Sequence, residues 1–460
     1  MDFFSKLATV AEIPGFNWKG LVVAFTAGQF AFDTYLNIRQ YNFLKNDKPQ
    51  TPEDGDEETF FKTQRYQLTK QRFSIFTGAY SFITNVAFLK FNVLPKLYYA
   101  TGQFISTYAV KFGFLKWFAS PTPQSVVTFL ALQVLSSIIS LPLSYYSTFV
   151  IEEKFGFNKQ TKVLFFTDFL KTQVLSFAIG TPIILGFVKI IEYFGDAFFL
   201  YVWSFFFVVQ IFMMTIAPIV IMPLFNKFTP LEDGSLKTKI EDLAKSLSFP
   251  LSKLFVIDGS KRSSHSNAFF TGLPWSKRIV LFDTLIEQAS SDEEIVAVIG
   301  HEIGHWAKNH LAKTLVVLQG NLSLIFFLFS AFFRNKSFYE SFGFDTTSPT
   351  SLFADRNNLP IIIGFILFLD ILKPLEFFTT FGSNLLSRKH EYEADEYATD
   401  LGMGEDLSSG LVTLFKENKS SARSDPLYSA YHYSHPLLPE RLAAIRARIE
   451  SNKTAEKKDQ

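Results

Sequence analysis

The chain has 460 residues, a net charge of +1 and no cysteine, which excludes disulfide bonds and thiolate metal ligands. Its near-neutral charge, without a dense basic cluster, gives no support to nucleic-acid binding. Aromatic residues make up 17% of the chain, with 56 Phe, and charged residues only 19%, a balance typical of a protein with lipid-facing surface.

Hydropathy predicts about seven membrane-spanning helices, because a span needs about 20 apolar residues to cross the hydrocarbon core. They cover residues 16–36, 73–95, 124–148, 172–193, 197–224, 311–333 and 359–381. A short turn at residues 194–196 separates the fourth from the fifth. We therefore expect a mainly α, polytopic membrane protein with five spans in residues 1–224 and two in residues 311–381.

Loop charge predicts the orientation of these spans. The first loop (37–72) carries seven Lys and Arg residues and the third (149–171) carries four, whereas the second carries three and the fourth none, a modest bias. Basic loops face the cytosol, so we expect a luminal N-terminus and a cytosolic C-terminus. The final residues 457–460 read Lys-Lys-Asp-Gln, which resembles a retrieval signal of the endoplasmic reticulum; the alternative is a frayed, charged tail. The predicted location is the endoplasmic reticulum membrane, with the inner nuclear membrane as a second site.

Two cytosolic stretches, residues 225–310 and 382–460, are expected to pack together over the ends of the spans. Within the first, residues 254–258 and 278–282 are predicted to be short strands, with Ser-Asn-Ala-Phe at 266–269 between them. A substrate strand could pair with this edge through backbone hydrogen bonds, Asn267 holding a substrate amide and Ala268 allowing close approach. The alternative is an ordinary surface loop.

The strongest chemical signal is His301-Glu302-Ile303-Gly304-His305. Residues four apart share one face of a helix, so the two imidazoles can bind one zinc ion while Glu302 acts on a water beside them. Ser291, followed by acidic residues 292–294, predicts the start of this helix. The alternative is a buried polar face on an interfacial helix.

A third zinc ligand is needed from elsewhere in the chain. Lys308 and Leu311 stand where a metzincin would have Gly and His, and His310 would lie about 140° from His305 on a continuous helix. Glu391 and Asp395 are four residues apart, beside small Ala394 and Ala398. We expect Glu391 to complete a set with His301 and His305, and Asp395 to accept the free N–H of His301. The alternative is a solvated acidic face.

Two spans separate these motifs, so both face the same side of the membrane. The ligands predict a peptidase in which Glu302 takes the proton of a zinc-activated water and delivers it to the leaving amine. His435 and Arg441 are candidate donors to the oxyanion; the alternative for each is a structural surface residue.

Taken together, these residues resemble the type I CAAX prenyl proteases, integral-membrane zinc endopeptidases of the endoplasmic reticulum, and their fungal members in particular. The matching segments are residues 152–161, 264–269, 301–306, 391–395 and 434–436 with Arg441. Departures are mild: Ile303 replaces a commoner Leu, and Phe-Phe-Thr at 269–271 replaces Tyr-Phe-Tyr. The resemblance implies a membrane chamber capped by one zinc ion per chain. It also implies removal of the last three residues of farnesylated CAAX proteins and a second cleavage nearer the N-terminus of some precursors.

The expected partners are therefore farnesylated CAAX substrates and membrane lipid. A membrane quality-control zinc protease would share the same ligands. A non-catalytic scaffold or transporter with a vestigial metal site is a further alternative, against which Glu302 argues, because a structural site has no need of it. Asp370, Lys373 and Glu376 fall within the last predicted span, where they would either line water or include an internal Asp370–Lys373 pair.

Overall fold

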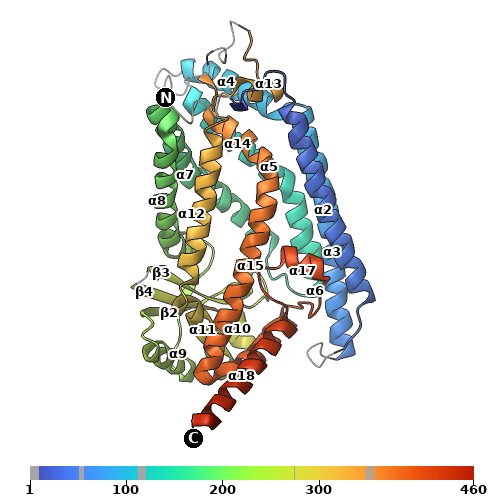
Figure 1. The fold of residues 1–460 in the computed structure, drawn as a ribbon, viewed down its shortest axis with the longest axis vertical. Coiled ribbons are helices and arrows are strands. Elements are labelled where there is room, and N and C mark those ends of the chain that lie inside the picture. The colour runs from blue at the N-terminus through green and yellow to red at the C-terminus, as the bar shows by residue number, and fades with distance from the viewer. Residues whose placement is uncertain are drawn as a thin grey trace.

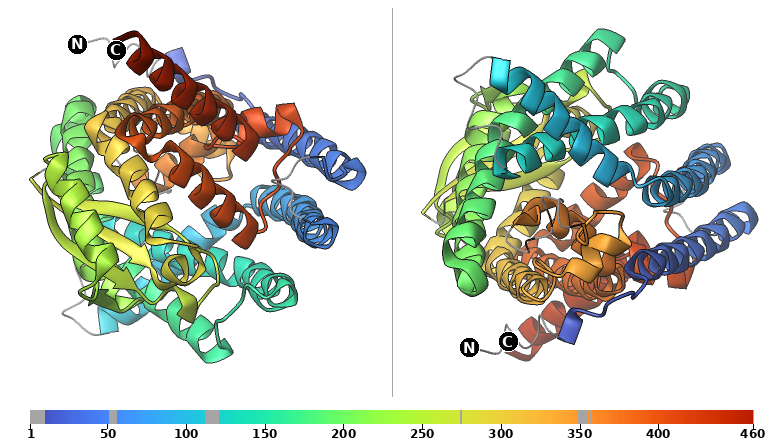
Figure 2. Two further views of the ribbon diagram at one scale, coloured as in Figure 1. Left: turned by 90° about the horizontal axis from the view of Figure 1, so that it is seen from below. Right: turned by 90° about the horizontal axis from the view of Figure 1, so that it is seen from above.

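The structure, a computed structural model, describes residues 10–50, 56–111, 121–273, 275–348, 353, 355 and 358–459. Long helices run along its long axis, and a small sheet lies toward the end from which the C-terminus projects (Figure 1). Seen along that axis, the helices stand around the molecule rather than in flat layers (Figure 2). The predicted class, mainly α with a small β element, is confirmed.

The N-terminal half forms a helix pair followed by apolar helices. The pair, α2 (Trp18–Asn46) and α3 (Glu57–Lys90), packs side by side. Next come α4 (Val93–Lys111), α5 (Pro121–Tyr146), η3 (Ser147–Glu152), α6 (Glu153–Phe155), α7 (Lys162–Phe194), η4 (Gly195–Ala197) and α8 (Phe198–Ile216). Two further turns, η5 (Ala217–Ile221) and η6 (Met222–Leu224), lead into the sheet region.

The C-terminal half alternates between the sheet end and the far end of the molecule. At the sheet end lie α9 (Ser235–Ser246), η7 (Gly259–Lys261), α10 (Asp283–Gln288) and α11 (Asp292–Ala307). The chain then runs up α12 (His310–Phe329), through α13 (Lys336–Ser341) and α14 (Ile361–Ile371), and back down α15 (Lys373–Ala398) (Figure 1). The last elements are η9 (Thr399–Met403), α16 (Gly404–Glu417), α17 (Pro426–His432) and α18 (Leu438–Asp459).

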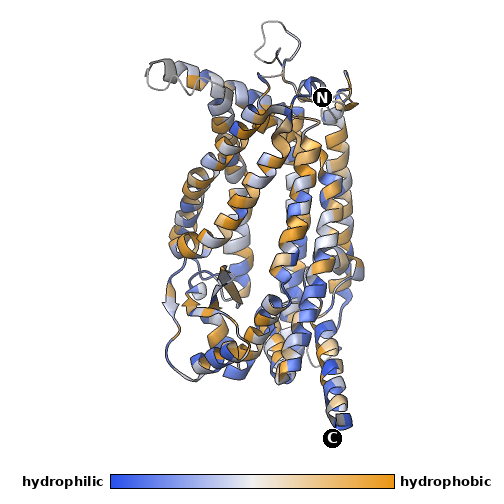
Figure 3. Cartoon of the chain, turned by 60° about the vertical axis from the view of Figure 1, so that its left-hand side comes forward, coloured by the Kyte–Doolittle hydropathy of each residue, from blue (hydrophilic) through white to orange (hydrophobic). Residues whose placement is uncertain are grey.

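Three described segments are long and apolar enough to cross a membrane: Thr122–Phe155, Lys162–Leu224 and His310–Phe329. The second contains both α7 and α8, separated by the predicted turn, so these segments correspond to the third to sixth predicted spans. The first predicted span falls almost entirely in α2, whereas the second runs past the end of α3 at Lys90 and through a short turn into α4; these helices fall outside this apolar group. Hydrophobic residues are prominent along the long helices, and hydrophilic residues are frequent around the sheet end and α18 (Figure 3).

The prediction of one continuous apolar helix over residues 359–381 is wrong. The chain breaks at Leu372, between α14, which has 11 residues, and α15. Pro374 explains the break, since proline lacks an N–H and is favoured in the first turn of a helix. At 1.5 Å per residue, α14 extends only about 16 Å, roughly half of the hydrocarbon thickness. α15 then continues unbroken to Ala398 and so connects the membrane region directly to the sheet end.

Aromatic residues form the core at the end of the molecule distant from the sheet. Phe187 of α7, Phe198 of α8, Phe329 of α12 and Phe368 of α14 are all buried there, with ring centroids of neighbouring pairs about 5–6 Å apart. In contrast, each apolar segment contains a hydrophobic stretch of 18 residues of which at most 11% is buried. Such low burial is expected of spans that face lipid on one side and a chamber on the other.

The sheet has the strand order β1-β2-β4-β3, with β3 at one edge. Its strands are β1 (Phe228–Pro230), β2 (Leu251–Ile257), β3 (Ala268–Leu273) and β4 (Ser276–Phe282). β2 and β4 are parallel, and β3 is antiparallel to β4. The two predicted strands correspond to β2 and β4 and are confirmed. A second hydrophobic core joins the sheet to α9 and α11.

Helix α11 packs against α9, α15 and α16, so residues of both stretches predicted to lie outside the membrane (225–310 and 382–460) surround it. The division of the chain into a membrane region (1–224), a cytosolic loop (225–310), a two-helix membrane region (311–381) and a tail (382–460) stays a prediction.

The charged residues of the last predicted span show features of both proposed arrangements. Lys373 Nζ lies 3.0 Å from Asp370 Oδ1 and donates a hydrogen bond to Thr26 Oγ1 at 2.7 Å. Lys373 also lines a cavity of about 220 Å³ together with Asp33 and Asn37 of α2. The internal ion pair therefore forms at the edge of a polar cavity.

Candidate active site

The two motif histidines lie on the last turns of α11. Its start is as predicted, because the Ser291 hydroxyl accepts a hydrogen bond from the Glu294 N–H and three acidic residues occupy the first turn. His301 and His305 point their Nε2 atoms at each other, 3.1 Å apart. His301 is buried, with only 6% of its surface exposed, while His305 lies at the edge of the solvent.

Glu391 approaches both histidines from α15. Its Oε2 atom lies 3.7 Å from His301 Nε2, and its Oε1 atom lies 3.4 Å from His305 Nε2. Zinc bonds of about 2.0–2.1 Å in a tetrahedral site place neighbouring donors about 3.3–3.4 Å apart, close to the three separations observed. These three residues are the one group among the described residues whose ligand atoms converge as a metal requires.

The chemistry of the donors also fits a cation. Glu391 Oε2 is buried and has no hydrogen-bond partner among the described residues. His435 Nδ1 lies 2.8 Å from it outside hydrogen-bonding geometry, so this contact is electrostatic. Burial opposes ionisation of Glu391, yet the adjacent histidines and Arg441 hold its pKa below the ordinary value. The carboxylate is therefore charged, as a zinc ligand must be.

Close packing of α11 on α15 brings the three donors together. A Cβ atom on Gly304 would lie 3.2 Å from both the Cα and the carbonyl oxygen of Ala394, closer than these backbone atoms readily allow. Ala394 and Ala398, singled out for their small size, are completely buried on α15. Small residues on both helices therefore set the distance between the histidines and Glu391.

Glu302 lies between the two histidines in sequence, with its side chain half-buried. Burial raises the pKa of this carboxyl group, although His301 and His305 act in the opposite direction. A raised pKa favours a general base that must later return its proton.

Asp395 holds the other ring nitrogen of His301. Its Oδ1 atom lies 2.9 Å from His301 Nδ1, which directs the Nε2 lone pair toward His305 and Glu391. Arg441 of α18 donates two hydrogen bonds to the same carboxylate, at 2.7 and 2.8 Å. Burial opposes ionisation of Asp395, but these bonds hold its pKa below the ordinary value. Arg441 also lies 3.4 Å from Glu391, and its predicted role as an oxyanion donor stays a prediction.

His310 contacts the site in a way that the sequence reasoning missed. The assumption of a continuous helix was wrong: α11 ends at Ala307, and Asn309 adopts a left-handed conformation (φ 57°) before α12 begins at His310. This turn brings His310 Nδ1 to 2.9 Å from His305 Nδ1, while His310 Nε2 lies 2.8 Å from Glu393 Oε2. His310 lies outside the ligand set but orients one of its members.

The contact of His305 with His310 and that of His301 with Asp395 determine which ring nitrogen of each histidine carries a proton. Glu393 requires a proton on His310 Nε2, so a neutral His310 accepts the Nδ1 proton of His305. Asp395 requires a proton on His301 Nδ1. Both Nε2 atoms then present lone pairs to each other at 3.1 Å, an arrangement that repels unless a cation lies between them. The residues present therefore fit a zinc ion.

We predict that His310→Ala and Glu393→Gln each weaken zinc binding by roughly 10- to 100-fold, the usual effect of removing an outer partner of a metal-bound histidine. Zinc affinity can be measured by competition with a chelator. Glu396→Gln is a matched control, since Glu396 is an exposed residue of the same helix whose carboxylate pairs with Arg448. Unchanged affinity in both variants would show that His305 does not need this orientation.

The predicted substrate residues lie at the start of the edge strand. Ala268 is the first residue of β3 and is buried, and exposed Asn267 precedes it with its side chain accepting a hydrogen bond from the Ala268 N–H. β3 pairs only with β4 among the described strands, which leaves its other edge without a strand partner. His435 lies between α17 and α18, and its side chain is 64% exposed.

The resembling segment at residues 152–161 lies next to this strand. The His265 ring stacks on Phe157 with centroids 4.1 Å apart, and Asn158 forms an isolated bridge with Ser263. His265 Nδ1 lies 2.9 Å from the Asn418 side chain at the end of α16. The N-terminal half thus supports the segment that leads into β3.

Both halves of the chain match families of known proteins. Residues 40–227 match the family described as the CAAX prenyl protease N-terminal region with five membrane helices, and residues 230–449 match peptidase family M48. CAAX prenyl protease 1 of Saccharomyces cerevisiae is 49% identical over 95% of this chain and 97% of its own. The human CAAX prenyl protease 1 homolog is 39% identical over 97% and 99%. The crystal structure of S. mikatae Ste24p superimposes with a TM-score of 0.86 at 47% identity, covering 94% of this chain and all of that one.

Proposed function

Since this chain belongs to peptidase family M48 and is a membrane-bound zinc CAAX prenyl protease, we propose that His301, His305 and Glu391 hold its zinc ion and that Glu302 is its general base. The observation that carries this proposal is the convergence of two imidazole lone pairs and a buried carboxylate, whose donor atoms lie 3.1–3.7 Å apart.

The residues around this centre have separate roles in hydrolysis. Zinc, when bound, lowers the pKa of water and polarises the scissile carbonyl group. Glu302 takes the proton of the attacking water and passes it to the leaving amine. Asp395 and His310 keep the two imidazoles oriented, and His435 donates to the oxygen that becomes negatively charged.

The substrate is positioned by the edge of β3. An extended chain can add to this edge through backbone hydrogen bonds, with Asn267 binding a substrate amide and buried Ala268 allowing close approach. We propose farnesylated CAAX proteins as the substrates, with a second cleavage nearer the N-terminus of some precursors. A farnesyl group prefers apolar surroundings, which the adjoining membrane helices provide.

We also propose that the protein resides in the endoplasmic reticulum membrane with its active site in the cytosol. The basic loops support this orientation. The unbroken α15 connects the membrane region to Glu391 and so keeps the active site close to the membrane. Lys457 and Lys458 are exposed in the last turn of α18, where a retrieval receptor could reach them.

Cleavage of paired peptides tests the substrate proposal. Purified protein should cleave a farnesylated CAAX peptide at least tenfold more efficiently, in kcat/KM, than the same peptide without the lipid. Equal efficiency on both, or preferential cleavage of an unfolded unlipidated protein, would instead support the quality-control alternative.

A further inference from the structure

An open cavity of about 540 Å³ adjoins the candidate metal centre. Its walls come from α3, from α16 with the loop after it, and from the segment between α17 and α18. His435 and Arg441, both in contact with Glu391, form its inner end. Its volume lies within the range of roughly 300–1,000 Å³ that ligand pockets have.

The direction of the edge strand leads a substrate into this cavity. A chain that pairs antiparallel with β3, the more stable arrangement, runs from the Leu273 end toward the Ala268 end. Beyond Ala268 lie Ser266 and His265, and both contact the Asn418 side chain, which lines the cavity. The residues downstream of the scissile bond therefore extend toward the cavity. Three extended residues span about 10 Å.

The cavity is suited to a negative charge. Lys70, His432, His435 and Arg441 line it, and none of its described lining residues is Asp or Glu. The Arg441 guanidinium is already bound by Asp395. Lys70 is exposed on α3, with its ammonium group 5.0 Å from the centroid of the buried Tyr66 ring. The nearby Glu152 carboxylate accepts the Tyr66 hydroxyl hydrogen bond at 2.9 Å and lies 3.6 Å from His265.

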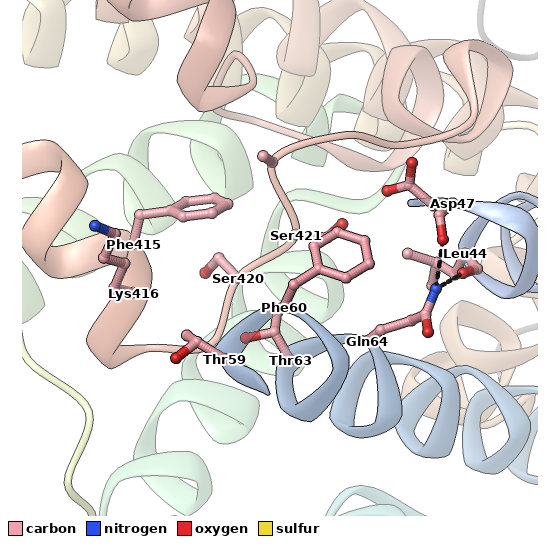
Figure 4. Close-up of a pocket in the computed structure, with 11 residues that line it drawn as sticks. Leu44, Asp47, Thr59, Phe60, Thr63, Gln64, Phe415, Lys416, Ser420 and Ser421 are labelled. Atoms are coloured by element: carbon pink, nitrogen blue, oxygen red, sulfur yellow. Dashed lines mark hydrogen bonds between the residues drawn. The ribbon is translucent and has the colours of Figure 1, made fainter. Parts of the chain in front are cut away.

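The wall that carries Lys70 is held in place by contacts between distant parts of the chain. Gln67, one turn before Lys70, donates a hydrogen bond to the Lys419 carbonyl oxygen. Figure 4 shows Gln64 donating to the carbonyl oxygens of Leu44 and Asp47, at 2.6 and 2.9 Å, beside the loop that contains Ser420 and Ser421. These contacts hold the part of α3 that carries Lys70 against the loop after α16.

We propose that this cavity binds the three residues released from the CAAX substrate and that Lys70 pairs with their C-terminal carboxylate. The inference rests on the proposed metal centre and adds the feature by which the enzyme recognises the end of the chain. Every CAAX substrate carries that carboxylate, whatever its last three residues are. A cation in the cavity that adjoins the zinc ligands therefore favours cleavage of the bond three residues from the end.

The test compares farnesylated CAAX peptides that end in a free acid or in an amide. The unmodified enzyme should prefer the acid by about tenfold in kcat/KM, which corresponds to about 1.4 kcal/mol. Lys70→Gln should raise KM for the acid about tenfold, leave its kcat within about twofold, and leave cleavage of the amide unchanged. Lys70→Arg should restore the preference, and Lys62→Gln, at an exposed position of the same helix outside the cavity, should not alter it.

Equal cleavage of acid and amide by the unmodified enzyme, or an equal loss on both substrates in Lys70→Gln, would overturn the proposal. Inhibition of the unmodified enzyme by the free tripeptide, about tenfold stronger than by its amide, tests it without any variant, and equal inhibition would contradict it. An error in the proposed metal centre is recognised separately, because zinc loading and cleavage of the amide would then be unaffected by changes at His301, His305 or Glu391.

Discussion

Replacing Glu302 by Gln is expected to leave zinc bound and to lower kcat for a farnesylated CAAX peptide by roughly 10²- to 10⁴-fold, the range that general acid–base groups contribute. The amide keeps the size of the side chain but cannot accept a proton from water. None of the three candidate ligands is changed, so the metal should remain. Metal analysis of the purified variant, together with its single-turnover rate, checks both parts of this expectation.

Glu293→Gln is a suitable control for this experiment. Glu293 lies in the first turn of the same helix, and its half-exposed carboxylate pairs with Lys239 of α9. Surface ion pairs of this kind contribute at most about 1 kcal/mol, so activity should be close to normal. Normal cleavage by Glu302→Gln would show that another group is the base, and loss of zinc would show that Glu302 holds the site together.

Local sequence patterns predicted much of the site because they act over one or two helical turns. The spacing of His301 and His305 requires only that the segment be a helix, and Ser291 with its acidic neighbours marks where that helix begins. Glu391 and Asp395 share a helix face for the same reason, so one residue reaches the centre of the site and the other reaches His301. The short apolar runs Leu254–Ile257 of β2 and Ile279–Phe282 of β4 likewise indicate strands without knowledge of their partners.

The sequence patterns did not predict features that depend on a break in a helix. Nothing in the composition around residue 309 requires Asn309 to adopt a left-handed conformation, yet this single turn converts His310 from a remote residue into a neighbour of His305. Asn is among the residues that tolerate this conformation, which is the one signal that could have indicated it. Pro374 was a stronger signal for the break between α14 and α15, and the hydropathy window averaged over it.

The cavity beside the metal centre lies beyond any local pattern. Lys70 and Arg441 are separated by most of the chain and line the same cavity because the tertiary fold brings α3 beside the loop after α16. The exposed lysine gives no periodic signal in α3, where it resembles any solvated charge. Lys70 is distinguished by the other residues that line the cavity, and those residues come together only in the tertiary fold.

Replacing Glu391 by Ala is expected to remove zinc and, with it, peptidase activity. Two imidazoles alone leave the ion one protein ligand short of the three that catalytic zinc sites use. We expect zinc occupancy after dialysis below about a tenth of normal. Asp395→Asn, which removes only an orienting partner, should weaken zinc binding roughly 10- to 100-fold and retain more zinc than Glu391→Ala under the same dialysis. Comparison of the zinc lost by the two variants therefore distinguishes a zinc ligand from a residue that only orients a ligand.

The fold should survive the Glu391→Ala change, which keeps the experiment interpretable. Arg441, the buried cation closest to Glu391, retains two hydrogen bonds to Asp395, so no buried charge is left without a partner. His435 is largely exposed and can be solvated by water. The loss of a carboxylate from a cluster of nitrogen groups should thus affect the metal far more than the helix packing, which depends on Gly304 and Ala394. Full zinc occupancy in this variant would exclude Glu391 from the ligand set, and unfolding at an ordinary temperature would show that the carboxylate stabilises the contact between α11 and α15 directly.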